Sequence, residues 1–232
     1  MSRQELEYKD IKLPTYPFGA NIEPDPALYE RLRANLDNRF SEPRPDIHVS
    51  DLVYCLRKSA FQKLDPTPVD DTSLSFFTAG KGHHDILEDL HGAEKEKEIW
   101  FENIVGHVDL LDGEPIEIKT TRSFRREIKQ HWIKQLAYYC AMLNKTEGKL
   151  IILYLFPKRQ KKQEDNKETN LNLIETYKVR FDDLSVILQD LLERRNLLLK
   201  ALDAKDPQLA PPVSEEEKWL CRVCPYKEEC KK

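Results

Sequence analysis

The sequence lacks any hydrophobic run long enough to cross a bilayer. The longest run, Leu150–Phe156, is far shorter than the ~20 residues that a membrane helix needs. The N-terminal stretch MSRQELEYKD also lacks the apolar core of a signal peptide. We therefore expect a cytoplasmic protein, whose cysteines serve as metal ligands or free thiols rather than as disulfides. These absences exclude membrane proteins, collagens and secreted disulfide scaffolds.

The sequence also lacks a basic excess and internal repeats. Its formal net charge is −4, so any nucleic-acid surface has to be a local basic patch. What is present is the composition of a folded chain, with 40% hydrophobic and 34% charged residues in 232 positions. This length and composition predict one domain, or one domain with a small appendage.

Apolar periodicity and turn residues predict an α/β fold with a mixed sheet and helices around it. The expected helices cover residues 26–38, 50–64, 74–95, 124–143 and 184–202. The expected strands cover residues 99–104, 105–111, 115–120, 150–156 and 176–181, with a solvated loop over 157–172. The proline-punctuated start is expected to form an irregular arm.

The most informative segment is the hairpin expected around Asp112-Gly113. Side chains alternate along a strand, so Glu117 and Lys119 share one face. A loop centred on Gly113 would place Asp109 directly opposite Glu117, and two like charges in such a pair are unfavourable. A divalent cation between the carboxylates would remove that penalty, and Mg²⁺ and Mn²⁺ prefer such oxygen ligands. A solvated hairpin with ordinary surface charges is the alternative.

Lys119 adds a cation beside these carboxylates. It can orient or deprotonate an attacking water, or stabilise charge that develops on a phosphate. A bound metal would lower the pKa of its water ligand and polarise the phosphoryl oxygen. Together these groups can hydrolyse a phosphodiester.

Upstream, His84 and Glu88 lie four residues apart and therefore share one helical face. The neutral imidazole of His84 is a candidate third metal ligand. A structural or solvated histidine is the alternative, and His83 and Asp85 are the other polar side chains at this point.

The segment 119–134 has the strongest local basic bias of the chain. It can hold phosphates electrostatically, or it can be an ordinary solvated helix face. Trp132, Tyr138 and Tyr139 can stack on bases or pack in the core. Gln135 and Tyr139 are four residues apart, so both can point toward the hairpin.

The last twelve residues contain three cysteines, Cys221, Cys224 and Cys230, which need a fourth ligand to hold a zinc ion or an iron–sulfur cluster. Cys55 is the better fourth ligand because its neighbours are basic, a setting that favours thiolate. Cys140 lies on an apolar helix face and is expected to be buried. Spacing alone does not distinguish zinc from iron–sulfur.

These motifs together match a known pattern. The set is Gly80-x3-His84-x3-Glu88, Gly106-x2-Asp109, Glu117-x-Lys119 and Gln135-x3-Tyr139, with one cysteine before it and three after it. In order and spacing the chain resembles the RecB-like, iron–sulfur branch of the PD-(D/E)XK nucleases, and within it the CRISPR-associated exonuclease family Cas-four. Two positions depart from the pattern: Val108 replaces a proline, and no glycine follows Lys119.

The resemblance implies a restriction-endonuclease-like α/β core, a [4Fe-4S] cluster, and cleavage of DNA at single-stranded ends with Mg²⁺ or Mn²⁺. It also implies prespacer processing, with the integrase proteins Cas-one and Cas-two as partners. In segments, it implies an arm over 1–45, a helical segment over 46–98, a nuclease core over 99–205 and an iron–sulfur tail over 206–232.

The same resemblance implies residue roles. The implied metal ligands are His84, Asp109, Glu117 and the Ile118 carbonyl; Lys119 is the catalytic lysine; Gln135 and Tyr139 position DNA or the lysine; Cys55, Cys221, Cys224 and Cys230 hold the cluster. Two alternatives stay open: a nuclease of this branch in DNA repair or a virus, and a non-catalytic nucleic-acid-binding module with structural zinc.

Overall fold

The computed structural model describes residues 25–40, 44–122, 127–155, 160–161, 168–169 and 173–231. The chain divides into two compact units, residues 1–42 and 43–232. In the first unit, helix α1 (Pro26–Phe40) begins after Asp25, whose Oδ1 accepts a hydrogen bond from the Leu28 amide at 2.8 Å. The second unit contains the sheet, the remaining helices and the C-terminal tail.

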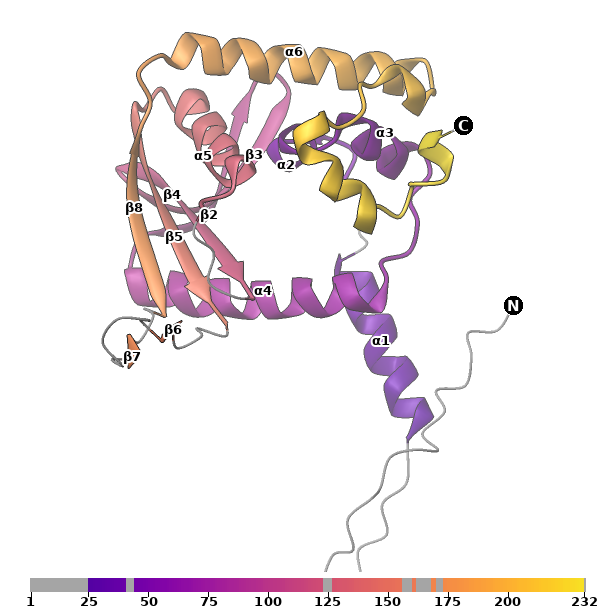
Figure 1. Cartoon of the computed structure of the whole chain (residues 1–232), viewed down its shortest axis with the longest axis horizontal. Helices are drawn as coiled ribbons and strands as arrows, with labels where there is room; N and C mark the ends of the chain where they lie inside the picture. The colour runs from indigo at the N-terminus through magenta and orange to yellow at the C-terminus, as the bar shows by residue number, and fades with distance from the viewer. Residues whose placement is uncertain are drawn as a thin grey trace, which may run out of the picture. The chain divides into compact units, whose positions relative to one another are not determined.

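The sheet of the second unit is mixed. Its strands run in the order β1 (Ile47–His48), β3 (Ile104–Asp112), β4 (Glu114–Thr121), β5 (Glu147–Tyr154) and β8 (Ile174–Arg180), while β2 (Glu94–Phe101) pairs with β3. The pairs β1–β3 and β4–β5 are parallel, and β2–β3, β3–β4 and β5–β8 are antiparallel. Helices flank this sheet (Figure 1), which confirms the predicted α/β class.

The two faces of the sheet are covered by different helices. Helix α5 (Gln130–Met142) packs on the face that carries Leu150 and Ile152 of β5. On the other face, Ile116 and Ile118 pack against Leu87 of α4 (Asp71–His91). Helix α6 (Leu184–Asp203) packs on α5 and on α3 (Leu56–Leu64). None of the described helices is long and apolar enough to cross a membrane.

The expected helix over residues 50–64 is two helices, α2 (Val49–Val53) and α3. Tyr54 and Cys55 interrupt it with extended backbone, so the single-helix prediction was wrong. Cys55 thereby occupies the N-cap of α3. The short strand β1 before α2 was also not predicted, since two residues are too few to produce a periodicity.

The helix expected over residues 74–95 starts and stops earlier. Asp70 caps its first turn through the Ser73 amide at 2.9 Å, and Gly92, at φ 75°, ends it in the left-handed conformation. The following strand therefore begins at Glu94 instead of Ile99. The charged sequence EKEKE hid this strand because it has no alternating apolar residues.

Other boundaries shift by a few residues. Helix α5 begins at Gln130 instead of 124, and residues 123–126 lie outside the described part of the chain. Within the expected loop 157–172, the described residues form a short antiparallel pair, β6 (Gln160–Lys161) with β7 (Glu168–Thr169).

Candidate active site

The β3–β4 hairpin has the predicted register. Leu110 lies opposite Ile116 and Asp112 opposite Glu114, so the turn is centred on Gly113, whose φ is 68°. One step beyond the paired residues, the Asp109 carboxylate accepts a hydrogen bond from the Ile118 amide at 2.7 Å. The Asp109 side chain thus accepts the hydrogen bond that a backbone carbonyl of β3 would otherwise accept from Ile118. This contact fixes the Asp109 carboxylate beside strand β4.

Glu117 is buried in the middle of β4, with 1% of its surface exposed. It pairs in register with Leu150, on the sheet face that α5 covers. The buried residues Ile116 and Ile118 on either side of it anchor the strand to the opposite face. The alternation predicted from the sequence therefore holds the carboxylate inside the protein and not on a solvated hairpin.

Lys119 lies next to this carboxylate and forms an ion pair with Glu117 Oε1. Its Nζ also donates a hydrogen bond to Gln135 Oε1 at 2.8 Å, and Gln135 Nε2 donates to the Tyr139 hydroxyl at 3.1 Å. Gln135 and Tyr139 are on one face of α5, as their spacing predicted. The helix therefore holds the lysine against the carboxylates.

Helix α4 brings His84 and Glu88 to the same place. His84 Nδ1 lies 3.6 Å from Asp109 Oδ1. One ligand atom from each of His84, Glu88 and Asp109 lies within 4.8 Å of the other two, close enough to hold a metal ion. The sequence had singled out Glu88 only as the helical neighbour of His84, without a role, although its four-residue spacing carried the signal.

The protein environment changes the pKa values in this cluster. Burial, and then the charge of Asp109, raise the pKa of Glu117 to about 8 against the opposing effect of Lys119. Burial lowers the pKa of His84, but the hydrogen bond and charge of Asp109 outweigh it, so the pKa is raised. The pKa of Lys119 is also raised because Glu117, Tyr54 and Asp109 outweigh burial. Lys119 is therefore a cation, suited to stabilising negative charge.

The residues present fit a divalent cation. Among the residues that the structure describes, Glu117 Oε2 is buried and has no hydrogen-bond partner. Such an atom is unfavourable unless a cation or proton binds there. The carboxylates next to it supply the hard oxygen ligands that Mg²⁺ and Mn²⁺ prefer, and the His84 imidazole adds a nitrogen donor. The Ile118 carbonyl, next to this set in the chain, remains a predicted ligand.

The aromatic residues of α5 serve the core. Trp132, Tyr138 and Tyr139 are buried, so of the two predicted roles the structure favours packing over base stacking. Tyr138 donates a hydrogen bond to Asp190 of α6. Of the basic residues before this helix, Arg125 and Arg126 lie outside the described part of the chain.

Three of the cysteines gather where the tail meets α3. The pKa of Cys224 is raised by burial and further by the neighbouring thiols of Cys55 and Cys221. Cys230 Sγ lies 3.9 Å from Arg57 Nη1, and Arg57 follows Cys55 by two residues in the chain. By contrast, Cys140 is fully buried and burial raises its thiol pKa to about 12.

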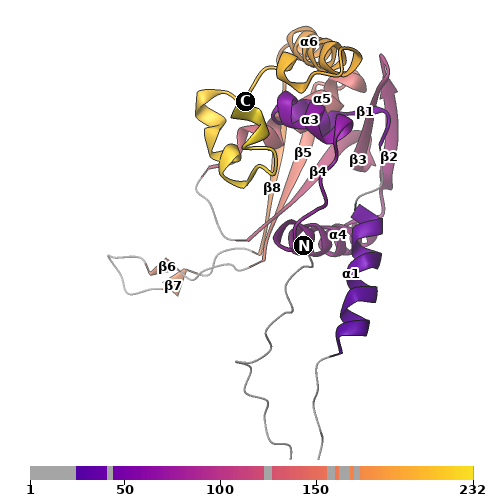
Figure 2. The same ribbon diagram turned by 90° about the vertical axis from the view of Figure 1, so that its right-hand side faces the viewer.

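Further contacts fix the tail on α3, as Figure 2 shows for the yellow C-terminal segment. Arg57 donates to the carbonyls of Ala210 and Gln208 at 2.9 and 3.2 Å. The Tyr226 ring stacks on Phe61 with centroids 5.3 Å apart, and its hydroxyl accepts from the Thr67 amide at 3.0 Å.

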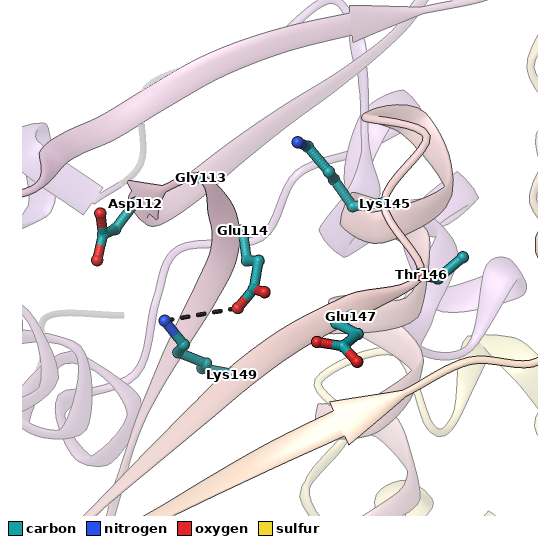
Figure 3. Close-up of a pocket in the computed structure, with 7 residues that line it drawn as sticks. All are labelled: Asp112, Gly113, Glu114, Lys145, Thr146, Glu147 and Lys149. Atoms are coloured by element: carbon teal, nitrogen blue, oxygen red, sulfur yellow. Dashed lines mark ion pairs between the residues drawn. The ribbon is translucent and has the colours of Figure 1, made fainter.

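A separate surface pocket lies at the turn of the hairpin, with a volume of about 370 Å³ (Figure 3). Its lining is of mixed charge: Asp112, Gly113, Glu114, Lys145, Thr146, Glu147 and Lys149. Lys149 forms an ion pair with Glu114 at 3.5 Å. No predicted site residue lines it, so this pocket is distinct from the candidate active site.

Comparison with solved structures shows a likeness in fold. The crystal structure of SSO0001 is 20% identical and covers 86% of this chain and 94% of its own, with a TM-score of 0.52. The alkaline exonuclease LHK-Exo from Laribacter hongkongensis is 12% identical and covers 72% of this chain and 94% of its own, with a TM-score of 0.46. No curated protein sequence matches the chain.

The family comparison is more specific. Residues 78–231 match the family described as the PD-(D/E)XK nuclease superfamily. The mixed central sheet with flanking helices agrees with its restriction-endonuclease-like fold and confirms that prediction. Because this match spans well over half of the sequence, the chain belongs to the PD-(D/E)XK nuclease superfamily.

Proposed function

We propose that this nuclease is a metal-dependent DNA exonuclease that hydrolyses phosphodiester bonds at single-stranded ends. The observation that carries the proposal is the buried carboxylate of Glu117, which has one oxygen paired with Lys119 and the other without a hydrogen-bond partner among the described residues. Asp109 and His84 stand beside it. Within this nuclease fold, the arrangement is that of a centre for phosphodiester hydrolysis.

The proposed ligands of Mg²⁺ or Mn²⁺ are His84, Asp109, Glu117 and the Ile118 carbonyl. When bound, the ion supplies Lewis acidity and a water of lowered pKa. Lys119 stabilises the negative charge that develops on the phosphate oxygens, and Gln135 keeps its ammonium in place. Tyr139 in turn orients Gln135. Water adds to phosphorus while one phosphorus–oxygen ester bond breaks, so the products carry a phosphate and a hydroxyl.

Glu88 is a further candidate ligand, because its ligand atom lies within 4.8 Å of those of His84 and Asp109. Burial raises the pKa of its carboxyl. A bound cation would stabilise the ionised form of such a carboxyl. Replacement of Glu88 by Gln should weaken Mn²⁺ binding in a calorimetric titration, and Asp89→Asn, at an exposed neighbour, should not.

We also propose that Cys55, Cys221, Cys224 and Cys230 hold a [4Fe-4S] cluster. Among the described residues, no three of these sulfur atoms lie mutually within 4.8 Å. Thiolates around one tetrahedral zinc stand about 3.8 Å apart, given the ~2.3 Å zinc–sulfur bond. No three of the four described sulfurs are therefore held together at zinc-binding distances. A broad visible absorption in anaerobically purified protein would support the cluster, and zinc without iron in metal analysis would oppose it.

The setting we propose is prespacer processing in CRISPR adaptation, with the integrase proteins Cas-one and Cas-two as partners. This part follows from the resemblance of the motif set to the family Cas-four. Co-purification with the integrase proteins encoded beside the gene would support it. Genes of recombination or of a viral genome in that position would favour a role in DNA repair or in a virus.

The alternative of a non-catalytic, zinc-stapled binding module is disfavoured by the complete set of Asp109, Glu117 and Lys119. The deciding assay compares linear and circular single-stranded DNA of the same sequence with Mn²⁺. We expect digestion of the linear strand only. Equal cutting of both strands would show an endonuclease instead of an exonuclease. Cutting of neither strand would favour the non-catalytic binding module.

A further inference from the structure

A row of aromatic rings begins next to the catalytic lysine and ends at the surface of the tail. The Tyr54 ring lies 5.0 Å from the ring of His131, and the His131 ring lies 6.0 Å from that of Trp219. The three residues come from the α2–α3 connection, from α5 and from the 3-10 helix η3 (Glu215–Val223). Figure 1 shows these segments next to one another.

The inner end of the row lies within electrostatic reach of the proposed catalytic groups. The charges of Lys119 and Glu117 both act on the Tyr54 hydroxyl, and the charge of Lys119 also acts on His131. Glu217 of the tail acts on Tyr54 as well, so the tail lies near this ring. The aromatic row therefore ends near the proposed catalytic groups.

The outer end is open to a ligand. Trp219 keeps 44% of its surface exposed, although its ring lies beside His131. The ammonium of Lys129 lies 5.8 Å from the centre of this ring and 4.9 Å from that of the buried Trp132. A cation thus stands at the edge of an exposed aromatic face, a combination that binds a base and its phosphate together.

His131 takes part as a neutral ring. Burial, followed by the charges of Lys129 and Lys119, lowers its pKa to about 4. Near neutral pH it carries no charge, and with 6% of its surface exposed its ring supports the Trp219 ring from behind and does not serve as a phosphate-binding cation.

We propose that the exposed indole of Trp219, backed by the buried His131 ring and by Tyr54 behind it, is a stacking platform for the unpaired bases of a single strand whose phosphates follow Lys129 to Lys119. This inference rests on the proposed function and adds the element that selects single-stranded substrates. Bases within a duplex already stack on one another and cannot occupy the platform without being unpaired. Stacking accepts every base, so the platform selects strandedness and not sequence.

The test is a binding measurement without added divalent ions, so that it does not depend on cleavage. Fluorescence anisotropy measures the affinity for a labelled oligothymidylate and for a labelled abasic strand of the same length and charge. Wild type should bind the oligothymidylate at least about tenfold more tightly. Trp219→Ala should bind the oligothymidylate about tenfold more weakly than wild type and the abasic strand with unchanged affinity. Trp219→Phe should retain most of the affinity for the oligothymidylate.

The matched control is Trp100→Ala, at an exposed tryptophan on β2, which should bind both strands as wild type does. Equal loss on both strands in Trp219→Ala would mean that Trp219 only holds the tail, and would overturn the proposal. If that variant does not fold, equal affinity of wild type for both strands overturns it alone. If the protein distinguishes the two strands but cleaves neither of them with Mn²⁺, the stacking platform would be supported and the proposed nuclease function would be refuted.

Discussion

Glu117 is the residue on which the site depends. A carboxylate that is 1% exposed, next to a second carboxylate, is unfavourable in the absence of a cation. The ion pair with Lys119 offsets only part of this cost, since the pKa of Glu117 stays raised. The candidate active site is therefore a locally destabilised position in β4, a feature common at functional sites.

This residue makes stability depend on pH in the metal-free protein. Folded Glu117 retains its proton up to about pH 8, whereas in the unfolded chain the carboxyl ionises near its ordinary pKa of 4.5. The free energy of unfolding should therefore fall as the pH rises between these values. Glu117→Gln cannot ionise, so its advantage over wild type should grow by more than about 1 kcal/mol between about pH 5 and pH 8.

Chemical denaturation with a chelator present measures this effect. Glu147→Gln is the control, because partly exposed Glu147 has its pKa lowered by Lys178 and Arg180 and should show no such gain. A pH-independent difference between Glu117→Gln and wild type would show that the carboxyl is not destabilised by burial.

At the scale of elements, the hairpin and α5 were predictable and the ends of α4 were only partly so. Alternation along β4 and the turn at Gly113 fixed the register, because a slip of one residue would exchange its apolar and its charged face. The approach of α4 to the hairpin could not be predicted from the sequence, because the contact of His84 with Asp109 depends on tertiary packing. For the same reason Glu88 had no assigned role and Trp219 was overlooked.

Two glycines, one on β3 and one on α4, should respond to alanine in opposite directions. At Gly106 of β3, an added Cβ would lie 2.9 Å from Ile99 and 3.0 Å from Tyr139, the residue that orients Gln135. Gly106→Ala should cost about 1–3 kcal/mol and slow cleavage. At Gly82, within α4, a Cβ meets nothing within 4 Å, so Gly82→Ala should stabilise by about 0.5–1 kcal/mol.

Urea unfolding of both variants gives these values. Stabilisation by Gly106→Ala would mean that β3 and α5 are not packed as described. Destabilisation by Gly82→Ala would mean that the space around Gly82 in α4 is not open as described.

At the scale of the whole molecule, the tail joins residues distant in the sequence. Arg57, Phe61 and Thr67 hold it against α3, and its cysteines meet Cys55 there. The cysteine spacing indicated a shared site. The contacts of Arg57 with backbone carbonyls could not be inferred, because a carbonyl acceptor leaves no trace in the sequence.

Loss of one proposed cluster ligand should therefore loosen the tail. Cys221→Ala should abolish the visible absorption, lower the melting temperature and raise hydrogen exchange over residues 208–231. Cys140→Ala is the control: it removes a buried thiol, so it should lower the melting temperature while keeping the absorption. Retention of full absorption by Cys221→Ala would exclude this residue as a ligand.

The central claim is that Lys119 and the carboxylates beside it hydrolyse DNA with a divalent ion. Its most direct test is the single-turnover rate of degradation of a labelled single strand with Mn²⁺, for wild type, Lys119→Ala and the control Lys149→Ala in the separate pocket. We predict that Lys119→Ala slows cleavage at least about 100-fold, that chelation abolishes it, and that Lys149→Ala cleaves as wild type does. Cleavage by Lys119→Ala at the wild-type rate would contradict the claim.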